Sequence, residues 1–122
     1  MTPFDRLNLY EQALERVVAH GGLGTIFFRR LADTESLAGA CNFIDLAIVP
    51  PGCSIGRHRH AADEEEFYLV LAGSGRMWRE GQEIRVGAGD LIRNPPGGAH
   101  GLINDGDCDI RLFVFEVPLA TG

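Results

Sequence analysis

The stretch that decides the fold covers residues 52–73 and reads GCSIGRHRHAADEEEFYLVLAG. Its first half ends in His58-Arg59-His60, where one residue separates two histidines. Side chains at positions i and i+2 of an extended chain point to the same side. The spacing therefore predicts that His58 and His60 present two imidazoles side by side.

The second half of this stretch is an acidic run, Glu64, Glu65 and Glu66, followed by the apolar sequence FYLVL. If Glu66 faces the interior of a β-structure, strand alternation turns Tyr68 to the same side. A buried carboxylate is costly unless it is paired or bound to a metal. The two histidines are therefore the expected partners of an inward glutamate.

A second stretch, residues 89–104, reads GDLIRNPPGGAHGLIN and brings a third histidine, His100, after a turn rich in proline and glycine. Three imidazoles and one carboxylate suit a divalent transition metal, namely Fe, Mn, Ni, Co, Cu or Zn. They do not suit calcium or magnesium, which prefer oxygen ligands. The pattern indicates a site for one such ion.

The chain around these stretches has the texture of an all-β protein, in which short apolar segments alternate with Gly, Pro, Asp and Asn clusters. Strands are expected near residues 25–31, 43–49, 65–71, 75–79, 83–86, 90–93, 100–104 and 110–117. Strands this short and numerous favour a closed barrel or a jelly roll.

Only the N-terminal part, residues 1–22, is predicted to be helical, because Leu7, Tyr10, Leu14 and Val17 recur at helical spacing after Thr2-Pro3. His20 is then expected at the C-terminal end of that helix, where it favours the helix dipole.

Length and composition narrow the class of protein. A chain of 122 residues fits one domain, here 1–122 with a barrel over 24–118. The formal net charge of −6, from 17 acidic and 11 basic residues, makes a nucleic-acid partner improbable. We expect no membrane segment and no secretory signal, and hence a cytoplasmic protein. The three cysteines, Cys41, Cys53 and Cys108, are expected to be reduced and mostly buried.

The region 52–104 resembles the cupin superfamily, whose two motifs are written G-x5-H-x-H-x(3,4)-E-x6-G and G-x5-P-x-G-x2-H-x3-N. The matching residues are Gly52, His58, His60, Glu66 and Gly73 in the first motif and Gly89, Pro95, Gly97, His100 and Asn104 in the second. The resemblance implies a small double-stranded β-helix (jelly-roll) barrel. It also implies a metal held by His58, His60, a glutamate and His100.

One departure from the motif leaves the glutamate open. Glu66 follows His60 by five residues instead of three or four, so the upstream spacing selects Glu64 or Glu65 and the downstream spacing selects Glu66. We favour Glu66, with Glu65 as the alternative, because strand alternation fixes the face of Glu66 while the preceding turn can absorb an extra residue. The glutamates that do not bind metal are expected to be solvated.

Other residues near the motifs have structural interpretations beside functional ones. The motif glycines are expected to permit turns, and Asn104 to cap one. Tyr68 is a candidate catalytic residue that would hydrogen-bond a ligand, and the alternative is a packing role with a satisfied hydroxyl. Arg57 and Arg59 alternate with the histidines and are expected to point away from them.

The resemblance to cupins leaves two functions open, because a fold does not determine an activity. The first is a metal-dependent enzyme, an oxygenase such as a dioxygenase or a lyase or cyclase of secondary metabolism, acting on a small organic molecule inside the barrel. The second is a non-catalytic module that binds or senses a small molecule in the same pocket. A homodimer is expected, with the apolar stretches 25–31 and 113–117 available for pairing.

Overall fold

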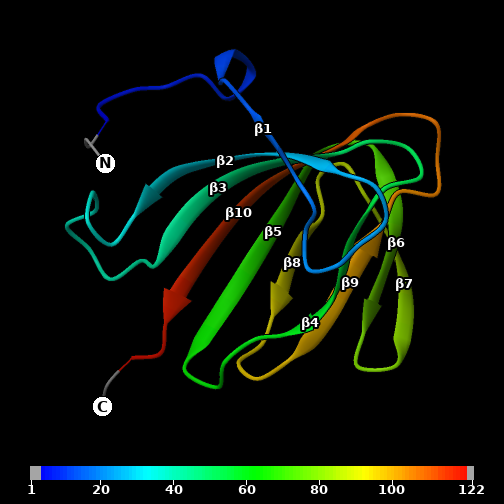
Figure 1. Ribbon diagram of the computed structural model, residues 1–122. Coiled ribbons are helices and arrows are strands. Elements are labelled where there is room, and N and C mark those ends of the chain that lie inside the picture. The colour runs from blue at the N-terminus through cyan, green and yellow to red at the C-terminus, as the bar shows by residue number, and fades with distance from the viewer. Residues whose placement is uncertain (1–3, 121–122) are drawn as a thin grey trace.

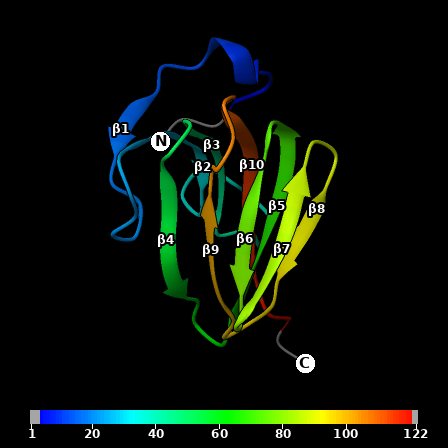
Figure 2. The same cartoon turned by 90° about the vertical axis from the view of Figure 1, so that its right-hand side faces the viewer.

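The computed structural model describes residues 4–120, and these residues form two antiparallel β-sheets that pack face to face (Figure 1). The larger sheet has the strand order β1 (Glu15–Val17), β2 (Ile26–Asp33), β3 (Phe43–Val49), β10 (Ile110–Pro118), β5 (Glu64–Ala72) and β8 (Leu91–Asn94). The smaller sheet has the order β4 (Ser54–Arg59), β9 (Ala99–Ile103), β6 (Ser74–Arg79) and β7 (Gln82–Gly87), and it faces the viewer in Figure 2. This architecture confirms the predicted all-β barrel.

The hydrophobic core lies between the two sheets and is built by alternating residues of the strands, as a half-buried sheet requires. Its buried members are Ile26, Ala47, Val49, Ile55, Tyr68, Val70, Met77, Val86, Ile92, Leu102, Ile110, Leu112 and Val114. The inward positions at one end of both strands are acidic, with Glu66 near the start of β5 and Glu116 near the end of β10, and these two residues are partners in the ladder. One end of the barrel interior is therefore polar, and this end carries the candidate site.

The expected strands agree with the structure to within two residues at every boundary. Two strands were not expected as such: β1, and β4, which carries the first histidine. The motif glycines Gly52, Gly73, Gly89 and Gly97 all have positive φ, between 70° and 93°, as a turn role requires. Asn104 also has its expected capping role, because its amide donates to the Val49 and Cys108 carbonyls and its Oδ1 accepts from Gly106 N–H.

The predicted N-terminal helix is wrong for the residues that the structure describes. A single 3-10 turn, η1 (Leu9–Glu11), is present, and Asn8 Oδ1 caps it by accepting from Tyr10 N–H at 2.8 Å. Leu7, Tyr10, Leu14 and Val17 do not share a buried face, and Tyr10 is 71% exposed. Without such a face a helix gains no tertiary packing, and residues 15–17 instead pair with the free edge of β2. Thr2 and Pro3 lie outside the described residues.

Two further expectations need correction. Residues 113–117 belong to β10, which lies between β3 and β5, so its backbone cannot pair with a second chain. The three cysteines are free, but they are not mostly buried: Cys108 is exposed, and Cys41 and Cys53 are half-buried.

No helix within residues 4–120 has the length and apolar character needed to span a membrane.

Candidate metal centre

Both sheets contribute to the candidate site. His58 on β4 and His100 on β9 are direct partners in the smaller sheet, so their side chains lie on the same face. His60 follows β4 by one residue, and Glu66 comes from β5 in the larger sheet. The fold thus brings four residues from three segments of the chain to one end of the barrel interior.

The donor atoms of these four residues converge on a common point. His58 Nε2 lies 3.2 Å from His60 Nε2, and Glu66 Oε1 lies 3.2 Å from Nε2 of both His60 and His100. All four donor atoms lie within 4.8 Å of one another. Ligands about 2.1 Å from one ion are separated by roughly 3.0–3.4 Å for right-angled to tetrahedral arrangements. The three separations of 3.2 Å fall in this range, so the four residues could hold a single transition-metal ion.

The burial of Glu66 favours a cation at this point. Glu66 and His100 are only 6% and 1% exposed, and Glu66 Oε1 forms no well-aligned hydrogen bond with any residue that the structure describes. An ionised carboxylate in such surroundings is costly unless a charge satisfies it. A cation between the three imidazoles and Glu66 would satisfy this oxygen.

Contacts behind two of the histidines fix the orientation of their rings. His58 Nδ1 lies 2.8 Å from the Gly56 carbonyl, which accepts a hydrogen bond from its N–H. His60 Nδ1 lies 3.3 Å from Glu64 Oε1 and 3.5 Å from Glu116 Oε2. Metal-binding histidines commonly donate their second ring N–H to such groups. Both rings therefore direct Nε2 toward the centre.

The same surroundings shift the pKa values of His58, His60 and Glu66 in different directions. Burial lowers the pKa of His58 to about 4. The carboxylate of Glu66, against the effect of burial, raises the pKa of His60 to about 9. Burial alone would raise the pKa of Glu66, but His100 and His60 outweigh it and lower this pKa to about 2. In the metal-free protein at neutral pH, Glu66 is thus ionised and His60 carries a proton.

Strand alternation separates the three glutamates of the acidic run. Glu66 faces inward with Tyr68 and Val70, as predicted. Glu65, the alternative, lies on the outer face of the sheet and forms an ion pair with Arg93 at 2.7 Å. Glu64 was expected to be solvated, which is wrong, because its carboxylate contacts His60 and the backbone N–H of Ala61.

Tyr68 lies where the sequence predicted it, on the face of Glu66 and 3% exposed. Its hydroxyl is 3.3 Å from His100 Nε2, so it adjoins the candidate centre. Burial raises the pKa of this phenol well above its ordinary value, and the hydroxyl therefore stays protonated. Tyr68 can donate a hydrogen bond at the edge of the site.

The two arginines that alternate with the histidines, Arg57 and Arg59, point away from the centre, as expected. The Arg57 guanidinium lies over the Trp78 ring, 4.4 Å from its centroid. Arg59 forms an ion pair with Glu80 at 3.1 Å and donates to the Gly97 carbonyl. Neither side chain competes for the four donor atoms.

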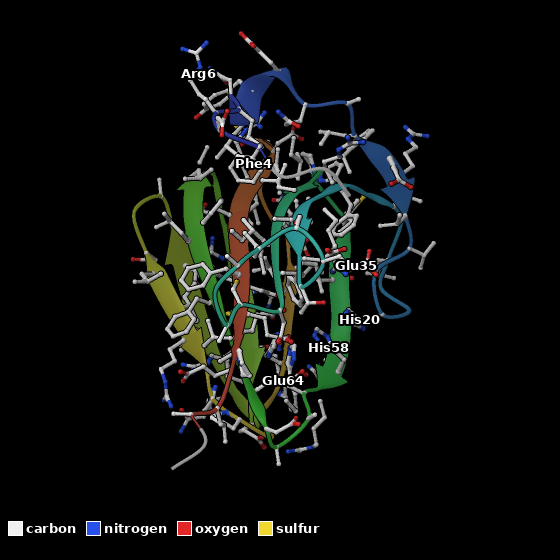
Figure 3. The ribbon with its side chains drawn as sticks, turned by 90° about the vertical axis from the view of Figure 1, so that its left-hand side faces the viewer. Phe4, Arg6, His20, Glu35, His58 and Glu64 are labelled. Atoms are coloured by element: carbon white, nitrogen blue, oxygen red, sulfur yellow. The ribbon has the colours of Figure 1, made fainter. Side chains whose placement is uncertain are left out.

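His20 and Glu116 also line the site, although the sequence interpretation did not place them there. The His20 ring stacks on His58 with centroids 3.6 Å apart, and Figure 3 shows the two side by side. His20 sits in a turn with φ of 50°, not at a helix end, so its expected role at the helix dipole is wrong. The alternation of Ile110, Leu112 and Val114 could have identified Glu116 as inward, whereas no local signal indicates His20.

A cavity of about 610 Å³ opens beside the four residues. Its wall includes the apolar side chains of Ile26, Phe28, Phe43 and Val114, and its polar lining includes His20 and Glu116. Burial raises the pKa of Glu116 to about 7, against the effect of a hydrogen bond from Asn42. The site can therefore hold an ion next to a partly apolar ligand.

Comparisons with known proteins agree with this fold. The family model described as a cupin domain matches residues 45–116. An oxalate-binding protein of Thermotoga maritima is 30% identical over 99 residues, which cover 81% of each chain. An uncharacterized protein of Methanocaldococcus jannaschii is 33% identical over 90 residues, 74% of this chain and 71% of the other. The crystal structure of a predicted oxalate decarboxylase from T. maritima, 27% identical, gives a TM-score of 0.87 over 93% of this chain and 99% of the other.

Proposed function

This chain belongs to the cupin domain family, and we propose that it binds one divalent transition-metal ion through His58, His60, Glu66 and His100. At that ion it captures a small carboxylate of the oxalate type. The observation that carries the proposal is the convergence of four donor atoms around a buried carboxylate oxygen that lacks an aligned hydrogen bond within residues 4–120. Three imidazoles and one carboxylate suit Fe, Mn, Ni, Co, Cu or Zn.

Such an ion would act as a Lewis acid toward the oxygens of the captured carboxylate. These oxygens would occupy coordination positions that the four residues leave open. Two arginines line the cavity, and both are already engaged: Arg30 is paired with Asp45 at 2.9 Å and Arg59 with Glu80. The remaining charged lining includes Glu64, Glu66 and Glu116. The protonated His60 of the metal-free pocket is already paired with Glu66, so an anionic ligand depends on the metal for its attraction to this pocket.

The test is calorimetric titration of oxalate into protein loaded with Mn²⁺ or Zn²⁺, into metal-free protein and into the His100→Ala variant. We expect saturable binding to the loaded protein alone, and weaker binding of acetate, which lacks a second carboxylate. Metal content is measured after each titration, because oxalate also chelates free ions. Equal binding to the metal-free protein, or none to a protein shown to retain its metal, would refute the proposed ligand.

A second candidate function is catalysis: a metal-dependent oxygenase such as a dioxygenase, or a lyase or cyclase. The observation that favours it is the cavity itself, because about 610 Å³ with an apolar wall falls in the range that holds whole organic ligands. Tyr68 is the candidate catalytic residue, since its hydroxyl adjoins His100. Product formation from a chelating substrate with an apolar body, lost in Tyr68→Phe at unchanged metal content, would support it. Ligand binding without product supports the binding function.

We also propose a homodimer that pairs through the outer face of the larger sheet. Phe67, Phe113 and Phe115 form an aromatic row there, with ring centroids 4.9 Å apart for Phe67 and Phe115 and 6.1 Å apart for Phe113 and Phe115. Large apolar patches on a surface are typical of protein interfaces. This arrangement uses the side chains of β10, whose backbone is already paired on both sides.

A further inference from the structure

The third histidine of the candidate centre differs from the other two. His58 and His60 each direct Nδ1 to an acceptor, namely the Gly56 carbonyl and the Glu64 and Glu116 carboxylates. His100 is 1% exposed, and its Nδ1 has no hydrogen-bond partner among residues 4–120. Because Nε2 of His100 faces Glu66 and Tyr68, Nδ1 at the other edge of the ring faces away from the centre.

A second cavity lies behind this ring, and we refer to it as the rear cavity. Its volume is about 190 Å³, and its lining includes His100, Asn94, Arg79, Glu80 and Gln82. The residues that line it come from β6, β7, β8 and β9 and the turns that join them, whereas the larger cavity is also bounded by β2, β3 and the turn before β2. Figure 2 shows where β6, β7, β8 and β9 lie.

Asn94 is the second unpartnered group of the rear cavity. It occupies the end of β8 directly opposite Glu66 in the ladder, and it is 1% exposed. Neither its Nδ2 nor its Oδ1 forms a hydrogen bond with any residue that the structure describes. Buried side-chain amides nearly always have such partners, supplied by protein or by ordered water. Two buried polar side chains therefore line the same small cavity with their hydrogen bonds unmade.

The charges around the rear cavity favour a neutral occupant. Arg79 donates to the Arg93 carbonyl, and Glu80 accepts from Arg59 and from the Ala99 N–H. The lining thus carries one cation and one anion, each already bound elsewhere. A volume of 190 Å³ is room for about six water molecules at about 30 Å³ each.

We propose that the rear cavity is a water site in which ordered water bridges His100 Nδ1 to the Asn94 amide, so that Asn94 is a positioning residue for the third histidine. The bridge would hold the His100 proton on Nδ1 and leave Nε2 free for the ion, as Gly56 and the carboxylates do for the other two rings. This part of the inference rests on the proposed metal function. The water site itself does not.

The test compares Asn94→Val with Asn94→Thr, two variants of nearly equal shape that differ by one hydroxyl. Loss of an outer hydrogen bond to a metal-binding histidine typically weakens metal affinity by about 10–100-fold. We therefore expect Zn²⁺ affinity to fall at least about 10-fold in Asn94→Val and to recover to within about threefold of wild type in Asn94→Thr. Ile92→Val, two residues earlier on the same strand, controls for lost packing and should leave the affinity unchanged.

Two readouts separate positioning from a general loss of structure. In the zinc-loaded protein, ¹⁵N NMR should show a slowly exchanging His100 Nδ1 proton that exchanges faster in Asn94→Val. A high-resolution crystal structure of the metal-free wild type should show water within hydrogen-bond distance of both His100 Nδ1 and Asn94.

Equal affinities of the Val and Thr variants would overturn the positioning role, and a crystal without water at His100 Nδ1 would overturn the water site. If wild type itself fails to bind Zn²⁺ or any other transition metal, the proposed function fails instead. The crystallographic result still decides the water site in that case, and also if Asn94→Val does not fold.

Discussion

At the scale of single residues, His60 is the point where the acidic groups of the pocket meet. Its Nε2 faces Glu66, while its Nδ1 faces Glu64 and Glu116. In the metal-free protein these carboxylates stabilise a protonated imidazole. A bound ion would take over the interaction with Glu66, because only a neutral imidazole binds a metal. The affinity of the site is therefore linked to pH through this residue.

The first prediction concerns proton release. At pH 8, metal binding should release about one proton, because His60 with its pKa of about 9 is still protonated, whereas His58 at about 4 is neutral and Glu66 at about 2 is ionised. Affinity should thus fall as pH falls below 9, by up to about tenfold per pH unit. Calorimetry in buffers with different heats of ionisation measures the proton count. Release that is the same at pH 8 and pH 10 would contradict this origin.

The second prediction ranks the three neighbouring glutamates. Glu66→Gln should weaken metal affinity most, by more than about 10-fold, because it removes the carboxylate among the donor atoms. Glu64→Gln should have a smaller effect through His60, and Glu65→Gln should have almost none, since Glu65 pairs with Arg93 outside the barrel. Competition with a chromophoric chelator gives the three constants. The reverse order of Glu65 and Glu66 would show that the upstream motif spacing was the better guide.

Residue identities were predicted best where a motif or strand alternation fixes the face of a side chain. The inward positions of Glu66 and Tyr68 follow from one strand, and alternation also excludes Glu65. His20, Glu116 and Asn94 lie near these residues only through contacts between segments far apart in sequence. A local pattern can show that a strand residue faces inward, but it cannot identify the neighbours of that residue.

At the scale of the elements, the turn between β1 and β2 is the part of the molecule that places His20. Gly56 on β4 and Gly22 in this turn lie against each other: Gly56 N–H donates to the Ala19 carbonyl, and a Cβ on either glycine would clash with backbone atoms. The spacing of apolar residues predicts the end of a helix in this region. Helical spacing was a poor guide there, because the apolar residues at that spacing have no surface to cover, while β2 offers an unpaired edge.

The third prediction tests this close approach. Gly56→Ala should lower the free energy of unfolding by about 1–3 kcal/mol, because its methyl group must displace the backbone of His20. Gly39→Ala is the matched control, since a Cβ there meets no atom within 4 Å among the described residues. Urea unfolding monitored by circular dichroism measures both. Equal stability of the two variants would show that the turn is not held against β4.

At the scale of the whole molecule, the barrel places two different cavities beside the candidate metal centre. The larger cavity offers an apolar wall beside the donor atoms, and the rear cavity offers a polar one behind His100. Sequence alone predicted the barrel, since strand length, turn residues and motif spacing all agree on it. It predicted a ligand pocket inside the barrel but neither the lining of that pocket nor the rear cavity, because both walls combine residues from the two sheets. The cytoplasmic location stays a prediction.

The fourth prediction concerns assembly. Wild type should sediment as a dimer, and Phe115→Glu should sediment as a monomer, because the charge interrupts the aromatic row on the outer face of the larger sheet. The control is Leu23→Glu, at an apolar residue that is 60% exposed outside that face, and it should remain a dimer. A monomeric wild type at micromolar concentration would refute the interface.

The most direct test of the central claim is elemental analysis of protein purified without a metal-chelating tag, alongside the His100→Ala variant. We predict about one equivalent of Fe, Mn, Ni, Co, Cu or Zn in wild type, and a sharp loss of that metal in a variant that keeps its β-sheet circular dichroism. A wild type that holds no metal and takes up none of these ions, or a His100→Ala variant with unchanged metal content, would contradict the assignment of the site.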